Sequence, residues 1–113
     1  MKSPKNARRG QLNATPGTSK PIFEIDLPHH FRVQVRRLPK AVRKDVGRTI
    51  DKLRGTFGRP HVHSGMGLRK LKRNYFECRV GLALRLVFRA EPGLLTFILA
   101  GDHDEVKRYA KGQ

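Results

Sequence analysis

Four short strand-like runs, of which the middle two alternate between apolar and polar residues, are joined by connectors of two to four residues and constrain the fold of this chain more than any other feature. The runs cover residues 68–72, 75–80, 84–89 and 94–100. Alternation with a period of two is typical of β-strands, because successive side chains point to opposite faces of a sheet. Connectors this short join neighbouring antiparallel strands. The sequence therefore predicts an antiparallel meander over residues 68–100.

The two faces of this predicted sheet differ in chemistry. One face is apolar and is predicted to pack against helices, with Phe76, Cys78, Val80, Leu84, Leu86 and Phe88. The opposite face is predicted to be exposed and basic, with Arg79, Arg85, Arg89, Lys70 and Lys72. The last run is apolar on both sides, so we expect it to lie centrally in the sheet.

Two amphipathic segments precede the strands and are predicted to be helices. Pro28 and Pro39 each suit the first turn of a helix, where the missing N–H of proline leaves no hydrogen bond unmade. Apolar residues recur at helical spacing in both segments, and Gly55 and Gly58 are expected to end the second. Because almost nothing separates the two helices, they are expected to pack as an antiparallel hairpin over the apolar sheet face. Residues 22–27 are predicted to form a short strand before them.

The ordered domain is expected to begin at residue 21. Residues 1–20 are polar, contain prolines and glycines and show no periodicity, so they are predicted to form a disordered basic arm. Residues 21–113 suffice for one domain with a single core, and residues 101–109 predict a charged turn and a short helix. The expected fold class is α+β: an N-terminal strand and a two-helix hairpin packed on a twisted, mainly antiparallel sheet of four to five strands, with a short C-terminal helix.

Positive charge extends along the whole chain. Lys and Arg number 25 against 9 Asp and Glu, a formal net charge of +16. Residues 1–20 contain 5 basic and no acidic residues, so the remaining 20 basic and 9 acidic residues leave +11 on the predicted domain. A field of this size concentrates anions, and each neutralised phosphate releases counterions. The charge predicts a polyanionic partner, with RNA favoured, against the alternative of a surface that is charged for solubility.

Several other classes of protein are disfavoured. Cys78 is the single cysteine, which excludes an internal disulfide and fits a cytoplasmic protein. Its predicted core-facing position argues against a catalytic thiolate. The sequence contains no run of 18 apolar residues, so no membrane span is predicted. It also contains no glycine-rich motif of the kind that binds phosphate, so no cofactor is predicted. His29, His30, His61 and His63 are potential metal ligands, but no accompanying ligand set predicts a metal site.

The residues of the basic face suit RNA cleavage without a metal. In that reaction the 2′-OH attacks the adjacent phosphate, and it needs a base, an acid and cations for the phosphorane charge. Arg79 and Arg85 could hold the phosphate through bidentate hydrogen bonds. His103 could act as acid or base, and Tyr109 could donate its proton if nearby arginines lower its pKa. Glu77 could be a base, or equally a salt-bridge partner of either arginine.

The strand sequences 67–72, 75–81 and 84–88, followed by 100–106, resemble the RelE/ParE superfamily of type II toxin–antitoxin toxins, and its RelE/HigB-like members in particular. The strongest elements are an Arg-x-Gly…Arg-Leu-Val-Phe strand pair and a Gly-x-His-Asp turn after the last strand. The resemblance covers about residues 22–110. It implies two helices packed on a twisted antiparallel sheet, and an antitoxin partner that covers the basic surface.

For the RelE-like branch the resemblance implies an mRNA interferase, an endoribonuclease that cleaves mRNA on the ribosome and inhibits translation. Arg85 matches that branch's phosphate-stabilising arginine, His103 stands where it carries a basic or histidine residue, and Tyr109 matches its terminal catalytic tyrosine. Phe76 and Cys78 stand where its best-known members have strand lysines.

Further basic residues are expected to contact RNA. They are Lys70, Lys72, Arg73 and Arg89 on the sheet, with Arg48 and Lys52 on the second helix. Two alternatives to the nuclease stay open at this point. One is a ParE-like inhibitor of DNA gyrase that performs no catalysis, and the other is a non-catalytic RNA-binding module.

Overall fold

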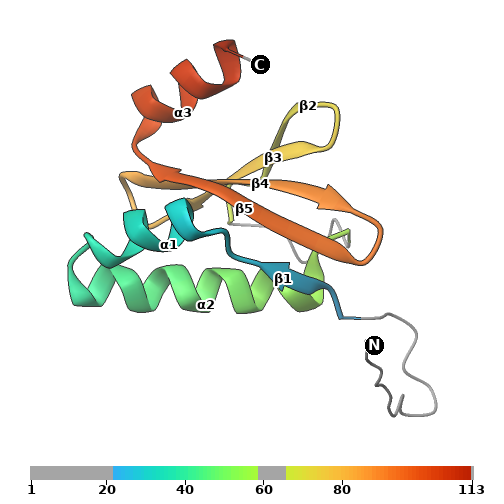
Figure 1. The fold of residues 1–113 in the computed structure, drawn as a ribbon, viewed down its shortest axis with the longest axis horizontal. Helices are drawn as coiled ribbons and strands as arrows, with labels where there is room; N and C mark the ends of the chain where they lie inside the picture. The colour runs from blue at the N-terminus through green and yellow to red at the C-terminus, as the bar shows by residue number, and fades with distance from the viewer. Residues whose placement is uncertain (1–21, 59–65, 113) are drawn as a thin grey trace.

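A computed structural model describes residues 22–58 and 66–112 as three helices and a five-stranded sheet (Figure 1). The elements are β1 (Glu24–Asp26), α1 (His29–Arg36), α2 (Lys40–Thr56), β2 (Arg69–Lys72), β3 (Tyr75–Val80), β4 (Leu84–Glu91), β5 (Leu94–Gly101) and α3 (His103–Lys111). The strands are ordered β1-β5-β4-β3-β2. The predicted α+β fold class is confirmed, whereas the arm expected over residues 1–20 lies outside the described residues.

Strands β2 to β5 form the predicted antiparallel meander. Every pair of consecutive strands from β2 to β5 is antiparallel, and β1 joins the edge in parallel with β5. Strand β5 therefore has a neighbour on each side, as its apolar sequence predicts. The turns contain Arg73, Gly81 and Gly93, whose φ angles are 48°, 67° and 75°. Left-handed φ values of this kind are typical of the tight turns that join antiparallel strands.

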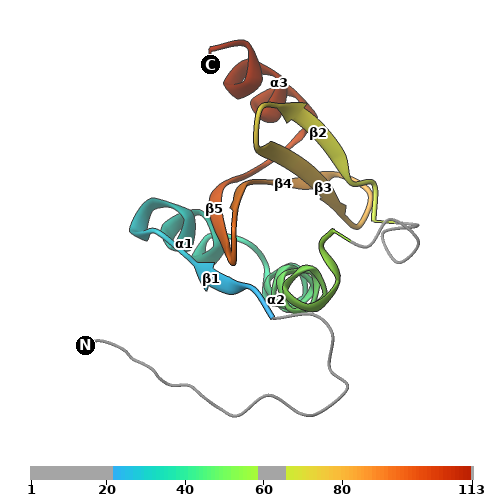
Figure 2. The same ribbon diagram turned by 90° about the vertical axis from the view of Figure 1, so that its right-hand side faces the viewer.

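Helices α1 and α2 cover one face of the sheet (Figure 2). The core between them contains Phe31, Val46, Ile50 and Leu53 from the helices and Cys78, Val80, Leu86, Phe88, Leu95 and Phe97 from the strands. The ring of Phe57, just beyond α2, contacts the rings of Phe23, Phe76 and Phe88 with centroids 5.7, 5.0 and 5.4 Å away. The helical stripes and the apolar strand face predicted from the sequence therefore meet in one core.

Two side chains of α1 complete the hydrogen bonding of β5 where β1 ends. Strand β1 pairs with only the first three residues of β5, Leu94–Thr96. Beyond them, His30 Nε2 lies 2.8 Å from the carbonyl oxygen of Ile98, and the Ala100 N–H donates to Gln34 Oε1 at 3.0 Å. These contacts occupy backbone groups that an unpaired strand edge would leave open. His30 thus has a structural contact here.

Helix α3 packs on the opposite face of the sheet, which the strand sequences predict to be exposed (Figures 1 and 2). Val87 and Glu77 on the strands and Val106 on α3 are 0, 1 and 2% exposed. The prediction of an open basic face is therefore wrong for its central part. The physical reason is that Val87 breaks the row of arginines along β4 and gives α3 an apolar position to cover.

A capping box begins α3 and explains part of the Gly-x-His-Asp sequence. The Glu105 N–H donates to the Asp102 side chain, and the Asp102 N–H donates to Glu105 Oε1, both at 2.8 Å. A Cβ atom at Gly101 would lie only 2.8 Å from Glu105 Oε1, so glycine makes room for the box. His103 is the first residue of the helix that this box fixes. No helix within residues 22–58 and 66–112 has both the length and the apolar character needed to cross a membrane.

Candidate functional site

The strand register brings Arg79, Arg85 and the start of α3 to one end of the sheet. Arg79 of β3 lies opposite Arg85 of β4, and Arg85 lies opposite Gly101 of β5. His103 follows two residues later, in the first turn of α3. Three of the predicted catalytic residues are therefore neighbours across adjacent elements. This end of the sheet is the candidate functional site.

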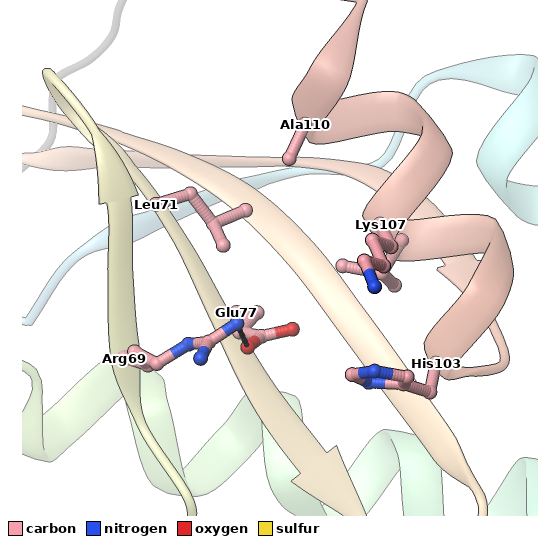
Figure 3. Close-up of a pocket in the computed structure, with 7 residues that line it drawn as sticks. Arg69, Leu71, Glu77, His103, Lys107 and Ala110 are labelled. Carbon is pink, nitrogen blue, oxygen red and sulfur yellow. Dashed lines mark ion pairs between the residues drawn. The ribbon is translucent and has the colours of Figure 1, made fainter.

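A cavity of about 260 Å³ opens between α3 and strands β2 and β3 (Figure 3). Its lining residues are Arg69, Leu71, Glu77, His103, Val106, Lys107 and Ala110. Figure 3 shows Arg69 and Glu77 on the strand side, with His103 and Lys107 facing them from the helix. The cavity thus collects a carboxylate, an imidazole, an ammonium and a guanidinium on a partly apolar floor, a composition typical of small polar ligand sites.

Glu77 is the buried charge of this cavity. Its Oε2 lies 2.8 Å from Arg69 Nη2 and 3.9 Å from Arg85 Nη1. Its Oε1 is buried and has no hydrogen-bond partner in the part of the chain that the structure describes. Of the roles left open by the sequence, the structure supports a salt-bridge partner for Arg85, with Arg69 closer still. A buried acceptor without a partner is rare in proteins and marks the floor of this cavity as unusual.

A one-residue bulge in β2 decides which basic residue faces Glu77. The register shifts between Lys70 and Lys72, so that Arg69 lies opposite Glu77 and Lys70 lies opposite Phe76. Cross-strand partners share a face, so the prediction that Lys70 lies on the same face as Glu77 is wrong. The bulge also carries Leu71 into the cavity. The pattern of apolar and polar residues in β2 does not by itself predict this register shift.

Arg85 and Arg79 are held in different ways. Arg85 is half-buried, with 25% of its side chain exposed, and its guanidinium is near Glu77. Arg79 has no ion pair among the described residues and packs over Gly67, where a Cβ atom would collide with the Arg79 Nε. Gly67 also has a φ of 63°, so both its conformation and its neighbour require glycine. Each arginine thus keeps guanidinium hydrogens available to an anion.

Tyr109 lies away from this group. Its ring centroid is 6.5 Å from that of Tyr75, which pairs with Arg89 at the opposite end of β3 from Arg79. Four residues of strand separate Tyr75 from Arg79, roughly 13 Å at about 3.3 Å per residue. Burial, with a further contribution from Tyr75, raises the pKa of Tyr109 more than Arg89 lowers it. The condition set for proton donation by Tyr109, a pKa lowered by arginines, is therefore not met, because partial burial outweighs the one nearby charge.

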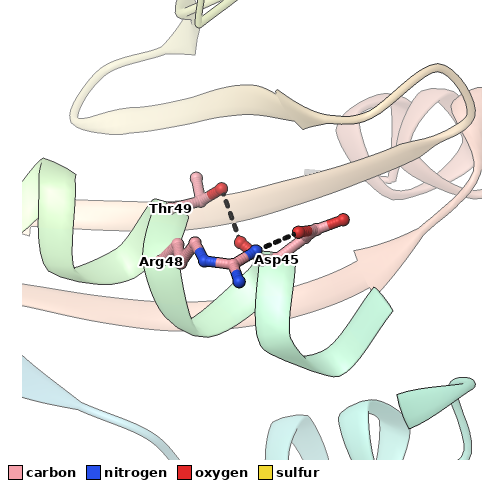
Figure 4. Close-up of polar contacts among 3 residues, drawn as sticks. All are labelled: Asp45, Arg48 and Thr49. Atoms are coloured by element: carbon pink, nitrogen blue, oxygen red, sulfur yellow. Dashed lines mark hydrogen bonds and ion pairs between the residues drawn. The ribbon is translucent and has the colours of Figure 1, made fainter. Parts of the chain in front are cut away.

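The other predicted RNA-binding residues fall on two separate surfaces. Lys70 and Arg73 are exposed around the β2–β3 turn, Lys72 is half-buried there, and a hydrogen bond to Tyr75 raises the pKa of Arg89. Arg48 and Lys52 are exposed on α2, on the other side of the sheet. There Arg48 forms an ion pair with Asp45 at 2.7 Å, beside the hydrogen bond from Thr49 to the Asp45 carbonyl (Figure 4).

Sequence reasoning missed Arg69 and Lys107 as cavity residues. Lys107 lies four residues after His103, so the two share one helix face, and this signal was available in the sequence. Arg69 depends on the bulge and had no such signal. Cys78 is buried on the core face, and burial, with a smaller effect of the Glu77 carboxylate, raises the pKa of its thiol to about 12. A protonated, buried thiol is a poor nucleophile.

Metal chemistry gains no support from the described side chains. Within residues 22–58 and 66–112, no three His, Cys, Asp or Glu residues are grouped as a metal site requires. His29 is exposed on α1, and His61 and His63 lie outside the described residues.

A helix hairpin on one face of the sheet and a short C-terminal helix on the other give this chain the fold of RelE-type toxins of toxin–antitoxin systems. The resemblance seen in the sequence is thus confirmed at the level of the fold. No family model matches the sequence, and no curated protein is significantly similar to it.

Three solved structures define this similarity. A chain in the archaeal RelE–RelB complex from Pyrococcus horikoshii has a TM-score of 0.61 and 14% identity over 72% of this chain and 94% of its own. A chain in the YoeB–YefM complex from Staphylococcus aureus has a TM-score of 0.53 and 17% identity over 72% and 97%. For the toxin–antitoxin complex RelBE2 from Mycobacterium tuberculosis the TM-score is 0.51, with 16% identity over 73% and 99%.

Proposed function

We propose that this chain is the toxin of a type II toxin–antitoxin pair and cleaves mRNA on the ribosome without a metal ion, which inhibits translation. The single observation that carries the proposal is the cavity in which His103 faces Arg69 and the buried Glu77, whose carboxylate also lies near Arg85. The fold shared with RelE-type toxins supports the same conclusion. The proposed partners are a cognate antitoxin, mRNA and the ribosome, all in the cytoplasm.

The proposed chemistry is transesterification at one phosphodiester. The 2′-OH loses its proton and attacks the adjacent phosphorus, and the bond to the 5′ oxygen of the next nucleotide breaks. The products are a 2′,3′-cyclic phosphate and a 5′-OH that has gained a proton. No oxidant, metal or water molecule is consumed.

Each group of the site has a role in this scheme. Arg85, oriented by Glu77, binds the phosphate and stabilises the charge that develops on the phosphorane, and Arg79, its cross-strand partner on β3, adds a second guanidinium. His103 transfers a proton, since an imidazole gives and accepts protons near neutral pH. Tyr109 has no assigned proton transfer in this scheme because it lies beside Tyr75 and Arg89 instead. Lys107 adds positive charge on the helix side of the cavity.

Induced expression of Arg85→Ala and His103→Ala variants in bacteria tests the nuclease. The parent is expected to stop growth and to produce mRNA cuts that primer extension detects, whereas each variant loses at least about 100-fold in cleavage, the contribution of one catalytic group. Arg37→Ala, an exposed arginine at the end of α1 on the far side of the sheet, is the charge-matched control and should cleave like the parent. If both site variants remain as toxic and cut mRNA as efficiently, the proposal fails. Growth arrest with intact mRNA and relaxed DNA would instead indicate a gyrase inhibitor.

A further inference from the structure

The cavity under α3 and the arginines at the end of the sheet are neighbouring but separate features. Arg79 and Arg85 are not among the residues that line the cavity. Glu77 connects the two, because it lines the cavity and its Oε2 lies 3.9 Å from Arg85 Nη1. A phosphate bound by Arg85 would therefore lie beside the cavity and not inside it. The cavity is left for another part of the ligand.

The unpaired oxygen of Glu77 determines what kind of group can bind in the cavity. Its Oε2 pairs with Arg69 at 2.8 Å, whereas its buried Oε1 has no hydrogen-bond partner among the described residues. Figure 3 shows this second oxygen turned away from Arg69, toward the helix that carries His103 and Lys107. Neither of these forms an ion pair with Glu77 within residues 22–58 and 66–112. A carboxylate oxygen accepts hydrogen bonds and repels other anions, so the cavity needs a ligand with a donor group and disfavours a phosphate.

The other walls of the cavity are largely apolar. Leu71, Val106 and Ala110 line it, and Leu71 is carried there by the bulge in β2. The volume of about 260 Å³ is below the roughly 300–1,000 Å³ of sites that hold drug-sized ligands. One ring system fits such a space, whereas an extended chain does not. Size and walls together favour a flat group with apolar faces and polar atoms on its edge.

Of the parts of an RNA chain, the base has these properties. Every base carries an N–H group beside a carbonyl oxygen or a ring nitrogen. The N–H can donate to Glu77 Oε1, while the neighbouring acceptor receives a hydrogen bond from Arg69 or Lys107. The faces of the ring can contact Leu71 and Ala110. Ribose and phosphate have no comparable apolar face, and the phosphate would meet the unpaired carboxylate oxygen.

We propose that the cavity is a nucleobase site, in which Glu77 Oε1 and the apolar walls bind the base of a nucleotide next to the phosphate held by Arg85. The identification of the ligand as RNA rests on the proposed function. Phosphate contacts position a nucleic acid without regard to its sequence, whereas contacts to base edges distinguish sequences. The protein would therefore read one base beside the cut, and its cleavage of mRNA would depend on that base.

The test measures binding of short oligonucleotides by fluorescence anisotropy, without ribosomes and without cleavage. The probe is a labelled tetranucleotide that contains A, C, G and U once each, with every 2′-OH methylated so that it cannot attack a phosphate. In further probes one residue at a time lacks its base. Ala110→Leu fills the cavity and leaves Glu77 in place. Ala41→Leu is the matched control, because Ala41 is exposed in the first turn of α2 and does not line the cavity.

In the parent and in Ala41→Leu, removal of one particular base is expected to weaken binding at least about fivefold, the lower limit for a single base contact. In Ala110→Leu no removal should cost more than about twofold, because the phosphate contacts that remain do not depend on the bases. Circular dichroism of Ala110→Leu should match that of the parent, which excludes unfolding as the cause. Glu77→Gln is a second variant that leaves the cavity open. Its amide can turn an N–H toward the ligand, so the largest loss should no longer fall on the same base.

The proposal is overturned if no base in the parent contributes more than about twofold, well below the effect of one base contact. It is also overturned if Ala110→Leu shows the same largest loss as Ala41→Leu, or if Glu77→Gln shows the same largest loss as the parent. These outcomes are separate from the nuclease. Base-dependent binding by a parent that leaves mRNA intact would contradict the cleavage and not the base site, and cleavage without base-dependent binding would do the reverse.

Discussion

Glu77 is a carboxylate at a position where the surrounding side chains would suit an apolar residue. It is 1% exposed, and its neighbours across the sheet and on α3 include Val87 and Val106. Removal of a charge from water costs several kcal/mol unless an opposite charge lies close by. Arg69 and Arg85 provide that charge from β2 and β4. The carboxylate thus ties together three elements that the sequence separates.

Replacement of this carboxylate by the amide of the same shape measures its contribution. Glu77→Gln leaves the half-buried Arg85 without its counter-charge, so the free energy of unfolding should fall by about 1–3 kcal/mol. Urea denaturation measures this change. Asp45→Asn breaks the exposed Arg48 pair and removes the same charge, yet should cost at most about 1 kcal/mol. Equal losses in the two variants would contradict the view that Glu77 has a special structural role.

At the scale of elements, α3 depends on its capping box more than α1 and α2 depend on their ends. The first residues of α1 and α2 follow Pro28 and Pro39, and neither helix has a side-chain cap. Helix α2 is held instead by three buried apolar residues, and α1 by the buried Phe31 with the partly buried Val35, whereas α3 buries only the smaller Val106. A short helix with so small a buried face gains much of its stability from its ends.

Asp102→Ala should therefore weaken α3 and the site that it carries. Loss of the cap is expected to cost about 1 kcal/mol and to increase hydrogen exchange of amides in residues 103–111 before the rest of the chain opens. Asp104→Ala is the control, because Asp104 lies in the same turn but makes no capping bond. It removes only a helix-dipole interaction, worth roughly 0.3–1 kcal/mol. Faster exchange in Asp104→Ala than in Asp102→Ala would contradict the assigned role of the cap.

At the scale of the whole molecule, the sheet separates two positively charged sides. The side covered by α3 carries the cavity with Arg69, His103 and Lys107, and the side covered by α1 and α2 carries a hollow of about 300 Å³ whose walls include Arg32 and Arg43. Net charge alone does not distinguish these sides. Depth and apolar content do, because one hollow ends on a buried carboxylate and the other on the apolar core.

This division predicts which basic residues control the salt dependence of RNA binding. Affinity for a single-stranded RNA should fall with the logarithm of salt concentration, and each lost phosphate contact should reduce the slope by about 0.7. Arg73→Ala, at the β2–β3 turn beside the cavity face, is expected to reduce the slope, whereas Lys52→Ala on α2 is not. Fluorescence anisotropy at several salt concentrations measures both. A reduced slope in Lys52→Ala alone would place the RNA on the helical side.

The sequence by itself determined the elements and one of the two packed faces. Alternation located β3 and β4, and an apolar run located β5, each to within two residues. The apolar stripes that contain Phe31 and Leu53 identified the helix faces that enter the core. It also brought Arg79, Arg85 and His103 to the same end of the sheet, because these positions follow from strand register across short turns. Local periodicity encodes such features, since each depends on neighbours only a few residues away.

The tertiary structure decided what depends on contacts between distant segments. Because of the bulge between Lys70 and Lys72, Arg69 and not Lys70 lies beside Glu77. Helix α3 packs on the arginine-bearing face of the sheet, which the sequence had predicted to be exposed. It also placed Tyr109 against Tyr75, at the opposite end of β3 from Arg79. A one-residue shift in register exchanges the two faces of a strand at almost no cost in local propensity. Only the packing of the complete domain selects between the two registers, and with it the residues that form the site.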